Sequence, residues 1–215
     1  MKISHTLKNG EQRNIIMDNE KNWTGNKKST YVTLGASNHT EKDREINDYY
    51  ATHPSTVKPL FDNEDLNNIW ECACGKGHLS SEMEKFGKEV YSTDIIDRGY
   101  TKFNSKVDFL KSIDLWWGDI VTNPPYKYAQ EFVEKSMEKI QEGRKVAMFL
   151  KLQFLEGQKR KELFKKYPPK TIYVFSKRQS CAMNGNFDKY PTSAVAYCWF
   201  VWEKGFTGDP IIKWI

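Results

Sequence analysis

The stretch Thr122-Asn123-Pro124-Pro125-Tyr126 holds residue types that together could bind and orient an amino group. It follows Asp119-Ile120-Val121, an apolar run typical of the end of a buried strand. Two prolines remove two backbone donors and hold φ near about −65°, so they form a rigid corner. This corner would aim the Asn123 amide oxygen, the Pro124 carbonyl and the Tyr126 ring at one planar group that carries an exocyclic NH2. The alternative is a turn that ends the strand and packs a tyrosine.

A second pattern, Glu71-x-x-x-Gly75-x-Gly77, ends an earlier strand-like run and opens a helix. Glycines let the backbone pass close to a ligand, and the start of a helix carries partial positive charge. Asp94 ends the next strand-like run, where it is placed to bind the hydroxyls of a ribose. A third glycine is missing, so no pyrophosphate cradle is indicated, and Glu71 suits a cationic ligand better. A tight strand–helix turn without a ligand would explain both glycines as well.

The elements that must position these residues alternate between strands and helices. Buried strands are predicted at 69–73, 89–93, 120–122, 146–150, 171–175 and 194–202. Helices are predicted after Gly77, at 128–141 and at 156–166, and Thr52 or Ser55 is expected to cap a short helix before the first strand. This alternation predicts a doubly wound α/β sheet. Residues 1–48 are predicted to form a polar arm, and residues 49–215 the domain, with a polar loop at 176–192.

Charge is distributed unevenly along the chain, whose 215 residues carry a formal net charge of +5. Residues 1–143 contain 19 basic and 23 acidic residues, whereas residues 144–189 contain 12 basic and 3 acidic residues. The segment after the Pro-Pro corner therefore has a net charge of +9, which indicates a polyanionic partner. A solvated basic helix face explains the charge alone equally well.

Composition limits the class of protein and its compartment. Hydrophobic residues make up 39% of the chain and aromatic residues 14%, enough for the core of one domain. The longest apolar run, 194–202, is nine residues and too short to span a bilayer as a helix, and no apolar signal segment opens the chain. We therefore expect a soluble, cytoplasmic protein. Cysteines 72, 74, 181 and 198 lack zinc-site spacing, so we expect buried thiols, no metal and no disulfide.

The order of these motifs resembles the S-adenosylmethionine-dependent adenine-specific DNA methyltransferases, whose catalytic motif is Asp/Asn-Pro-Pro-Tyr. The matching residues are Tyr50-Ala51-Thr52-His53-Pro54, Glu71-x-x-x-Gly75-x-Gly77, Asp94, Asp108-Phe109 and Asn123-Pro124-Pro125-Tyr126. They occur in the family's order over residues 50–202, and the resemblance is closest to small phage- or prophage-type enzymes. It implies a Rossmann-like sheet of seven strands, mostly parallel, with an antiparallel last strand at 194–202.

The resemblance implies S-adenosyl-L-methionine as the cofactor. Its methionine part would lie along Thr52 and Pro54, and its ribose would bind Asp94. The turn of the protein that holds the cofactor would be shaped by Glu71, Ala73, Gly75 and Gly77. Asp108 would accept a hydrogen bond from the cofactor's adenine amine, and Phe109 would stack on that ring. The implied partner is nucleic acid, as double-stranded DNA, and the implied setting is a bacterial or phage-infected cell, with the protein a monomer or homodimer.

The catalytic residues implied are Asn123, Pro124, Pro125 and Tyr126. An adenine amine is a poor nucleophile because its lone pair is delocalised into the ring. Hydrogen bonds from that amine to Asn123 Oδ1 and the Pro124 carbonyl would favour a pyramidal nitrogen, and Tyr126 would stack on a base flipped from the duplex. The candidate phosphate contacts are Lys151, Lys177, Arg178 and Lys189.

One departure from the family concerns how sequence would be read, and two alternatives to the proposed activity stay open. The chain has no room for a separate target-recognition domain of usual size, so only 176–192 and the arm could read sequence. Related motifs serve methyltransferases that act on RNA base amines or on protein glutamine, and the +9 segment argues only against protein. A second alternative is an inactive binding module that keeps the cofactor fold.

Overall fold

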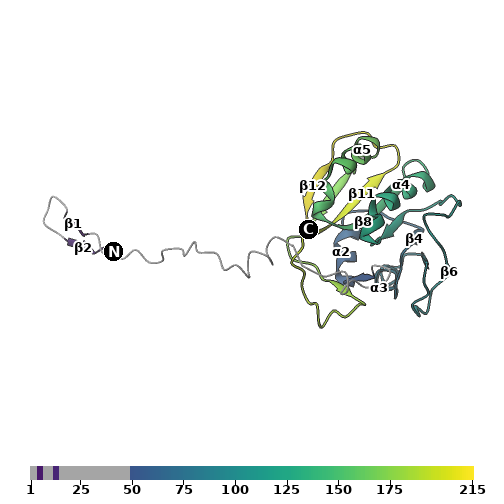
Figure 1. Ribbon diagram of the computed structural model, residues 1–215, viewed down its shortest axis with the longest axis horizontal. Helices are drawn as coiled ribbons and strands as arrows, with labels where there is room; N and C mark the ends of the chain where they lie inside the picture. Colours follow the sequence, from purple (N-terminus) through teal and green to yellow (C-terminus); the bar gives the residue numbers. More distant parts are fainter. Residues whose placement is uncertain (1–3, 7–11, 15–48) are drawn as a thin grey trace. The chain divides into compact units, whose positions relative to one another are not determined.

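The computed structural model describes residues Ser4–Thr6, Gln12–Asn14 and 49–215 (Figure 1). The first two ranges form strands β1 (Ser4–Thr6) and β2 (Gln12–Asn14), which pair with each other in antiparallel fashion and belong to a unit separate from the rest. The remainder of the predicted arm lies outside the described residues. Everything below concerns 49–215.

A sheet of eight strands, in the order β12-β9-β11-β8-β7-β4-β5-β6, forms the centre of this unit. The strands are β4 (Ile69–Glu71), β5 (Val90–Asp94), β6 (Ser105–Lys106), β7 (Ile120–Thr122), β8 (Lys145–Lys151), β9 (Thr171–Val174), β11 (Tyr197–Glu203) and β12 (Ile211–Trp214). All neighbouring pairs are parallel except those of β11, which runs antiparallel to both β8 and β9. The α/β class with a mostly parallel sheet is therefore confirmed.

Helices cover both faces of the sheet, as Figure 1 shows, with α4 and α5 above it and α2 and α3 below it. They are α2 (Val57–Phe61), α3 (His78–Lys85), α4 (Ala129–Lys139) and α5 (Gln158–Lys166), with short 3-10 turns at Pro54–Thr56, Tyr126–Tyr128 and Leu152–Leu155. Alternate residues of β8 serve the two layers: Met148 packs with α4 and α5, whereas Phe149 packs with α2 and α3. A strand buried on both faces explains the continuous apolar run in this part of the sequence.

Three details differ from the sequence predictions. The antiparallel strand was expected to be the last of seven, but β12 follows it and makes the sheet eight strands wide. The segment 176–192 was expected to be a loop, but it contains β10 (Cys181–Met183), which pairs in antiparallel fashion with β3 (Tyr50–Thr52). The short 3-10 turn at Pro54–Thr56, which precedes the first predicted strand, is capped by neither Thr52 nor Ser55. Its N-cap is His53, whose Nδ1 accepts a hydrogen bond from the Ser55 amide at 3.2 Å.

Of the four cysteines expected to be buried, Cys181 is only half-buried. Strand β4 ends at Glu71, before the predicted end at residue 73, so Cys72 and Cys74 lie in the turn that follows it. Both are buried, and all four cysteines of the described region are free thiols. Within that same region, no helix has the length and apolar character needed to cross a membrane.

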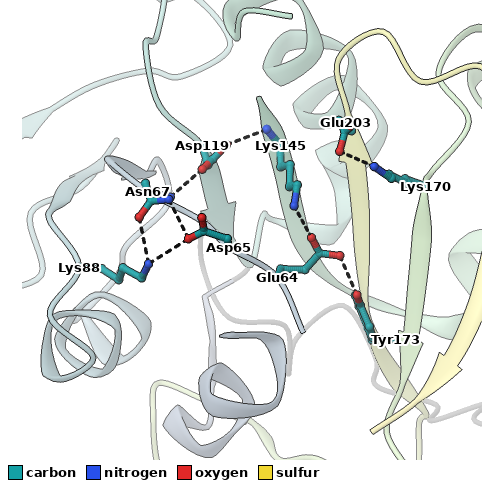
Figure 2. A network of polar contacts seen from close by, with 9 residues as sticks. All are labelled: Glu64, Asp65, Asn67, Lys88, Asp119, Lys145, Lys170, Tyr173 and Glu203. Atoms are coloured by element: carbon teal, nitrogen blue, oxygen red, sulfur yellow. Dashed lines mark hydrogen bonds and ion pairs between the residues drawn. The ribbon is translucent and has the colours of Figure 1, made fainter. Parts of the chain in front are cut away.

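A polar network joins the amino ends of the central strands (Figure 2). Glu64 accepts hydrogen bonds from Lys145 Nζ at 2.6 Å and from the Tyr173 hydroxyl at 2.6 Å. Asp119, just before β7, accepts the backbone amides of Asn67 and Lys145, both at 2.7 Å. These bonds satisfy buried carboxylates whose burial without partners would cost folding free energy, and they fix the amino ends of the strands.

Candidate active site

A pocket of about 710 Å³ opens where the carboxyl ends of β4, β5 and β7 meet, and β3 closes it from the side. Parallel strands place their carboxyl ends at one edge, which is where ligands bind in open α/β sheets. The volume lies in the range of small-molecule and cofactor sites. Ten predicted residues line it: Thr52, Glu71, Ala73, Asp94, Asp108, Phe109, Asn123, Pro124, Pro125 and Tyr126. Pro54, Gly75 and Gly77 do not line it, and neither do the four predicted basic residues.

Asn123 leaves the end of β7 with its side-chain amide held in one orientation. Its Nδ2 donates a hydrogen bond to the Tyr50 carbonyl of β3 at 2.7 Å. Its Oδ1 is buried and has no hydrogen-bond partner in the part of the chain that the structure describes. Because buried acceptors are nearly always satisfied, the orphan oxygen of this pocket-lining residue is a candidate acceptor for a ligand donor.

Tyr126 begins the 3-10 turn after the Pro-Pro corner. Its hydroxyl lies 3.1 Å from Cys181 Sγ, and its ring lies 6.1 Å from the ring of Tyr197, centroid to centroid. Burial raises the pKa of the Tyr126 hydroxyl well above its ordinary value, so this group is neutral. Lys151 places its ammonium 4.8 Å from the centroid of the Tyr126 ring, a cation–π contact that makes Lys151 a neighbour of the corner.

Glu71 is buried at the end of β4 and is tied to α3 and β5 through two serines. The Ser80 hydroxyl donates a short hydrogen bond to Glu71 Oε2, and the Ser92 hydroxyl donates to Ser80 Oγ at 2.7 Å. Burial raises the pKa of Glu71 to about 8, against the effect of the Ser80 bond. A buried acid of this kind becomes favourable as a carboxylate when a cation enters the pocket beside it.

Asp94, at the end of β5, holds the glycine turn. Its Oδ2 accepts the Gly75 amide at 2.8 Å, and its Oδ1 accepts the Ile96 amide at 3.0 Å. Each oxygen keeps a further lone pair, so the carboxylate can also accept a ligand hydroxyl. Asp94 therefore orders the glycine turn in this structure, and its remaining lone pairs leave room for its predicted role in binding ribose.

The two glycines are required by tyrosines that pack on the turn. Gly75 has φ +58° and Gly77 has φ +77°, a conformation that side-chain-bearing residues rarely adopt. A Cβ at Gly75 would lie 2.3 Å from the Tyr49 ring, and a Cβ at Gly77 would lie 2.3 Å from the Tyr100 ring. The close approach that these glycines permit is thus made by aromatic rings of the protein itself.

Asp108 and Phe109 line the far end of the pocket. Asp108 forms an ion pair with Lys111 at 3.2 Å and keeps 33% of its side chain exposed. Phe109 is buried, stacks on Phe132 at 5.0 Å and meets Trp70 edge-on at 5.1 Å. The ring is thus a rigid part of the core that contributes one surface to the pocket.

Three residues of the site escaped the sequence analysis. Tyr49 lines the pocket, and the Arg98 guanidinium lies 4.3 Å from the centroid of its ring. Arg98 also lines the pocket, and its buried Nε has no partner in the described region. Cys181 reaches the corner from β10. Adjacency to the Tyr50-Ala51-Thr52 motif could have suggested Tyr49, but no local pattern pointed to Arg98 or Cys181.

The predicted basic residues lie outside the pocket. Lys177, Arg178 and Lys189 are exposed on the segment that contains β10, and Lys151 ends β8 beside Tyr126. The lysines of α5 are exposed as well: Lys159, Lys161, Lys165 and Lys166. Part of the +9 charge is neutralised, because Lys145 pairs with Glu64 and Lys170 pairs with Glu203.

Comparison with protein-family profiles gives no match, and comparison with curated proteins gives none either. Solved structures do resemble the chain. A Pyrococcus horikoshii protein assigned as an RNA methyltransferase has TM-score 0.55 at 12% identity, over 85% of this chain and 100% of that one. A Listeria monocytogenes protein assigned as a class I S-adenosylmethionine-dependent methyltransferase has TM-score 0.52 at 11% identity, over 87% and 71%. A chain of a type I restriction–modification system has TM-score 0.50 at 15% identity, over 87% and 48%.

These likenesses define the fold of the chain as that of the class I methyltransferases, a mostly parallel α/β sheet with one antiparallel strand. The pocket at the carboxyl ends of β4, β5 and β7 lies where open sheets of this kind bind ligands.

Proposed function

We propose that the protein transfers a methyl group from S-adenosylmethionine to the exocyclic amine of adenine in DNA. The observation that carries the proposal is Asn123, a residue that lines the pocket: its amide is oriented by the Tyr50 carbonyl, and its buried Oδ1 has no partner among the described residues. Such an oxygen keeps its lone pairs for a hydrogen bond from an amine that reaches it.

The pocket suits the cofactor on four counts. Glu71 is a buried acid that can face the cofactor's ammonium group, and Asp94 keeps acceptor capacity for ribose hydroxyls. Val107, Phe109 and Leu110 supply apolar surface for a purine ring. Thr52 Oγ1 is buried without a partner in the described region, so it is a free hydroxyl beside the expected methionine part. When bound, the cofactor supplies an electrophilic methyl group attached to a sulfonium.

The residues of the corner would then act on the target amine. Asn123 Oδ1 and the Pro124 carbonyl accept its two hydrogens, which favours a pyramidal nitrogen whose lone pair faces the methyl group. With the cofactor bound, the nitrogen would form its bond to the methyl carbon as the carbon–sulfur bond breaks, and the surplus proton on nitrogen would pass to solvent. The contribution of these acceptors is orientation and electrostatic stabilisation.

Tyr126 and the basic residues would hold the nucleic acid. The Tyr126 ring is the aromatic surface nearest Asn123 in sequence and offers a stacking face to a base taken out of the duplex. Lys177, Arg178 and Lys189 are exposed and form no ion pair with any described residue, so they are free to contact phosphates.

RNA is the second candidate substrate, because the corner binds an amine without reading the sugar and a structure of the same fold is assigned as an RNA methyltransferase. The test is to incubate the protein with labelled cofactor and separate samples of DNA, RNA and protein, then digest the labelled polymer and identify the product by mass spectrometry. N6-methyladenine in DNA is expected. Label in RNA alone would replace DNA by RNA, and no label in any polymer would refute the proposed activity.

A further inference from the structure

Cys181 is the residue that joins segment 176–192 to the Asn-Pro-Pro-Tyr corner. It opens β10, whose register sets Cys181 opposite Thr52 of β3. Its sulfur lies 3.1 Å from the Tyr126 hydroxyl, 3.8 Å from Asn123 Nδ2 and 3.7 Å from the Tyr50 carbonyl. One sulfur therefore contacts the two side chains that the proposed function places on the substrate, and also the carbonyl that orients one of them.

The directions of these hydrogen bonds follow from the chemistry of the groups. The Tyr50 carbonyl can only accept, so the contact of the thiol with it requires the thiol to donate. When the thiol hydrogen faces Tyr50, the sulfur accepts from Asn123 Nδ2 and from the Tyr126 hydroxyl; between Cys181 and Tyr126 either group can donate. Burial raises the pKa of the Cys181 thiol, so the hydrogen that this pattern requires stays in place.

We infer that Cys181 is a positioning residue for methyl transfer, which acts by holding the Tyr126 hydroxyl and hence the position of the ring on which the target base would stack. The inference rests on the proposed function. Asn123 has its own strong bond to Tyr50, at 2.7 Å, so the contact at 3.8 Å adds little to its orientation. The Tyr126 hydroxyl also hydrogen-bonds with the Tyr197 hydroxyl, so Cys181 is one of two side chains that hold it.

This arrangement gives segment 176–192 a second task. Lys177 and Arg178 lie a few residues before Cys181 on the same segment, and both are exposed. A nucleic acid that binds these side chains would therefore contact the segment that contains β10. Through Cys181 of β10, this contact outside the pocket is connected to the Tyr126 ring that lines the pocket.

The test compares Cys181→Ala, Cys181→Ser, Tyr126→Phe and the double variant Cys181→Ala/Tyr126→Phe, with Cys198→Ala as the matched control. Cys198 is also a free thiol, and it is fully buried where Cys181 is half-buried; its hydrogen bond among the described residues goes to the Leu150 carbonyl of β8, and it lies outside the pocket. We expect Cys181→Ala to lower kcat roughly tenfold, the scale of one hydrogen bond, with cofactor affinity unchanged. Cys181→Ser, which keeps a donor and an acceptor, should recover most of that loss.

The double variant shows whether Cys181 acts through Tyr126. If it does, Cys181→Ala has no further effect on kcat once the hydroxyl is gone, whereas multiplying losses would overturn the inference. A kcat for Cys181→Ala equal to that of Cys198→Ala would overturn it as well.

A measurement without substrate separates this inference from the proposed function. In protein with carbon-13-labelled tyrosine, the ring signal of Tyr126 is identified by its loss in Tyr126→Phe. That signal should move in Cys181→Ala and stay in place in Cys198→Ala. If wild-type protein methylates no polymer, the proposed function fails, and the ring signal still decides the positioning role. An unmoved signal in Cys181→Ala refutes that role whatever the activity.

Discussion

Replacement of Asn123 by alanine tests the centre of the proposed site. The change removes the buried Oδ1 that has no partner in the described structure, and with it the hydrogen bond of 2.7 Å to Tyr50. Loss of one preorganised group that stabilises a transition state lowers kcat by about 10²- to 10³-fold. Loss of the structural bond costs only about 1 kcal/mol of folding free energy. The expected result is a folded protein with nearly no methyl transfer.

The assay measures kcat for transfer of labelled methyl groups to DNA, cofactor affinity by calorimetry and the melting temperature. Cofactor affinity should change by less than about threefold, because Asn123 faces the substrate amine in the proposal and not the cofactor. Asn63→Ala is the matched control: Asn63 Nδ2 also donates to a backbone carbonyl, that of Pro59 at 3.0 Å, but outside the pocket.

The result that refutes the reasoning is equally specific. If Asn123→Ala keeps a kcat close to that of Asn63→Ala, the free oxygen is not the acceptor for the amine. If it loses cofactor affinity as strongly as activity, Asn123 belongs to the cofactor site, and the clamp must be sought elsewhere in the corner.

Three further predictions concern pH, the glycine turn and nucleic acid. Folding raises the pKa of Glu71 from 4.5 to about 8, so the contribution of its neutral form to the stability of the cofactor-free protein is complete below pH 4.5 and is lost as pH rises toward 8. The melting temperature should therefore fall over this pH range, and Glu71→Gln should flatten that fall. An unchanged slope in the variant would contradict the prediction. Gly77→Ala should destabilise the protein more than Gly87→Ala, since both have positive φ but only Gly77 has a ring 2.3 Å from the added Cβ; equal melting temperatures would remove the argument from Tyr100. Nucleic-acid affinity should fall steeply with salt, and Lys177→Ala should reduce the logarithmic slope by about 0.9, whereas Lys58→Ala, whose lysine pairs with Asp62, should not; a flat salt response would mean that the basic segment is only a solvated surface.

The parts of the fold that the sequence predicts are those with long, regular patterns. Strand β8 is a seven-residue strand buried along most of its length, and α4 repeats its apolar residues at helical spacing, so both were found within one or two residues of their observed ends. The α/β class follows from such elements. The positions of Asn123 and Tyr126 after β7 follow too, because the prolines mark where the strand must stop.

The parts that were missed depend on contacts between distant residues. Strand β10 has only three residues within a polar segment, and its partner β3 lies about 130 positions earlier. No local sequence pattern therefore predicts that either segment is a strand. Strand β12 is short and exposed, and it exists because β9 offers a free edge. Likewise, the sequence shows two glycines but not the tyrosine rings that require them.

The pairing of β3 with β10 also has a consequence for how the protein is made. Asn123 is oriented by a carbonyl of β3, and β10 is the strand that pairs with β3 in the described structure. A chain that emerges from the ribosome in order completes β3 early but must wait for residues 181–183 before that strand gains its partner. Contacts of such long sequence separation form late and slowly. Strands β11 and β12 follow β10 in the chain, and β11 joins β8 to β9. A nascent chain that stops short of β10 would therefore lack both the partner of β3 beside the amine site and the strand that completes the sheet.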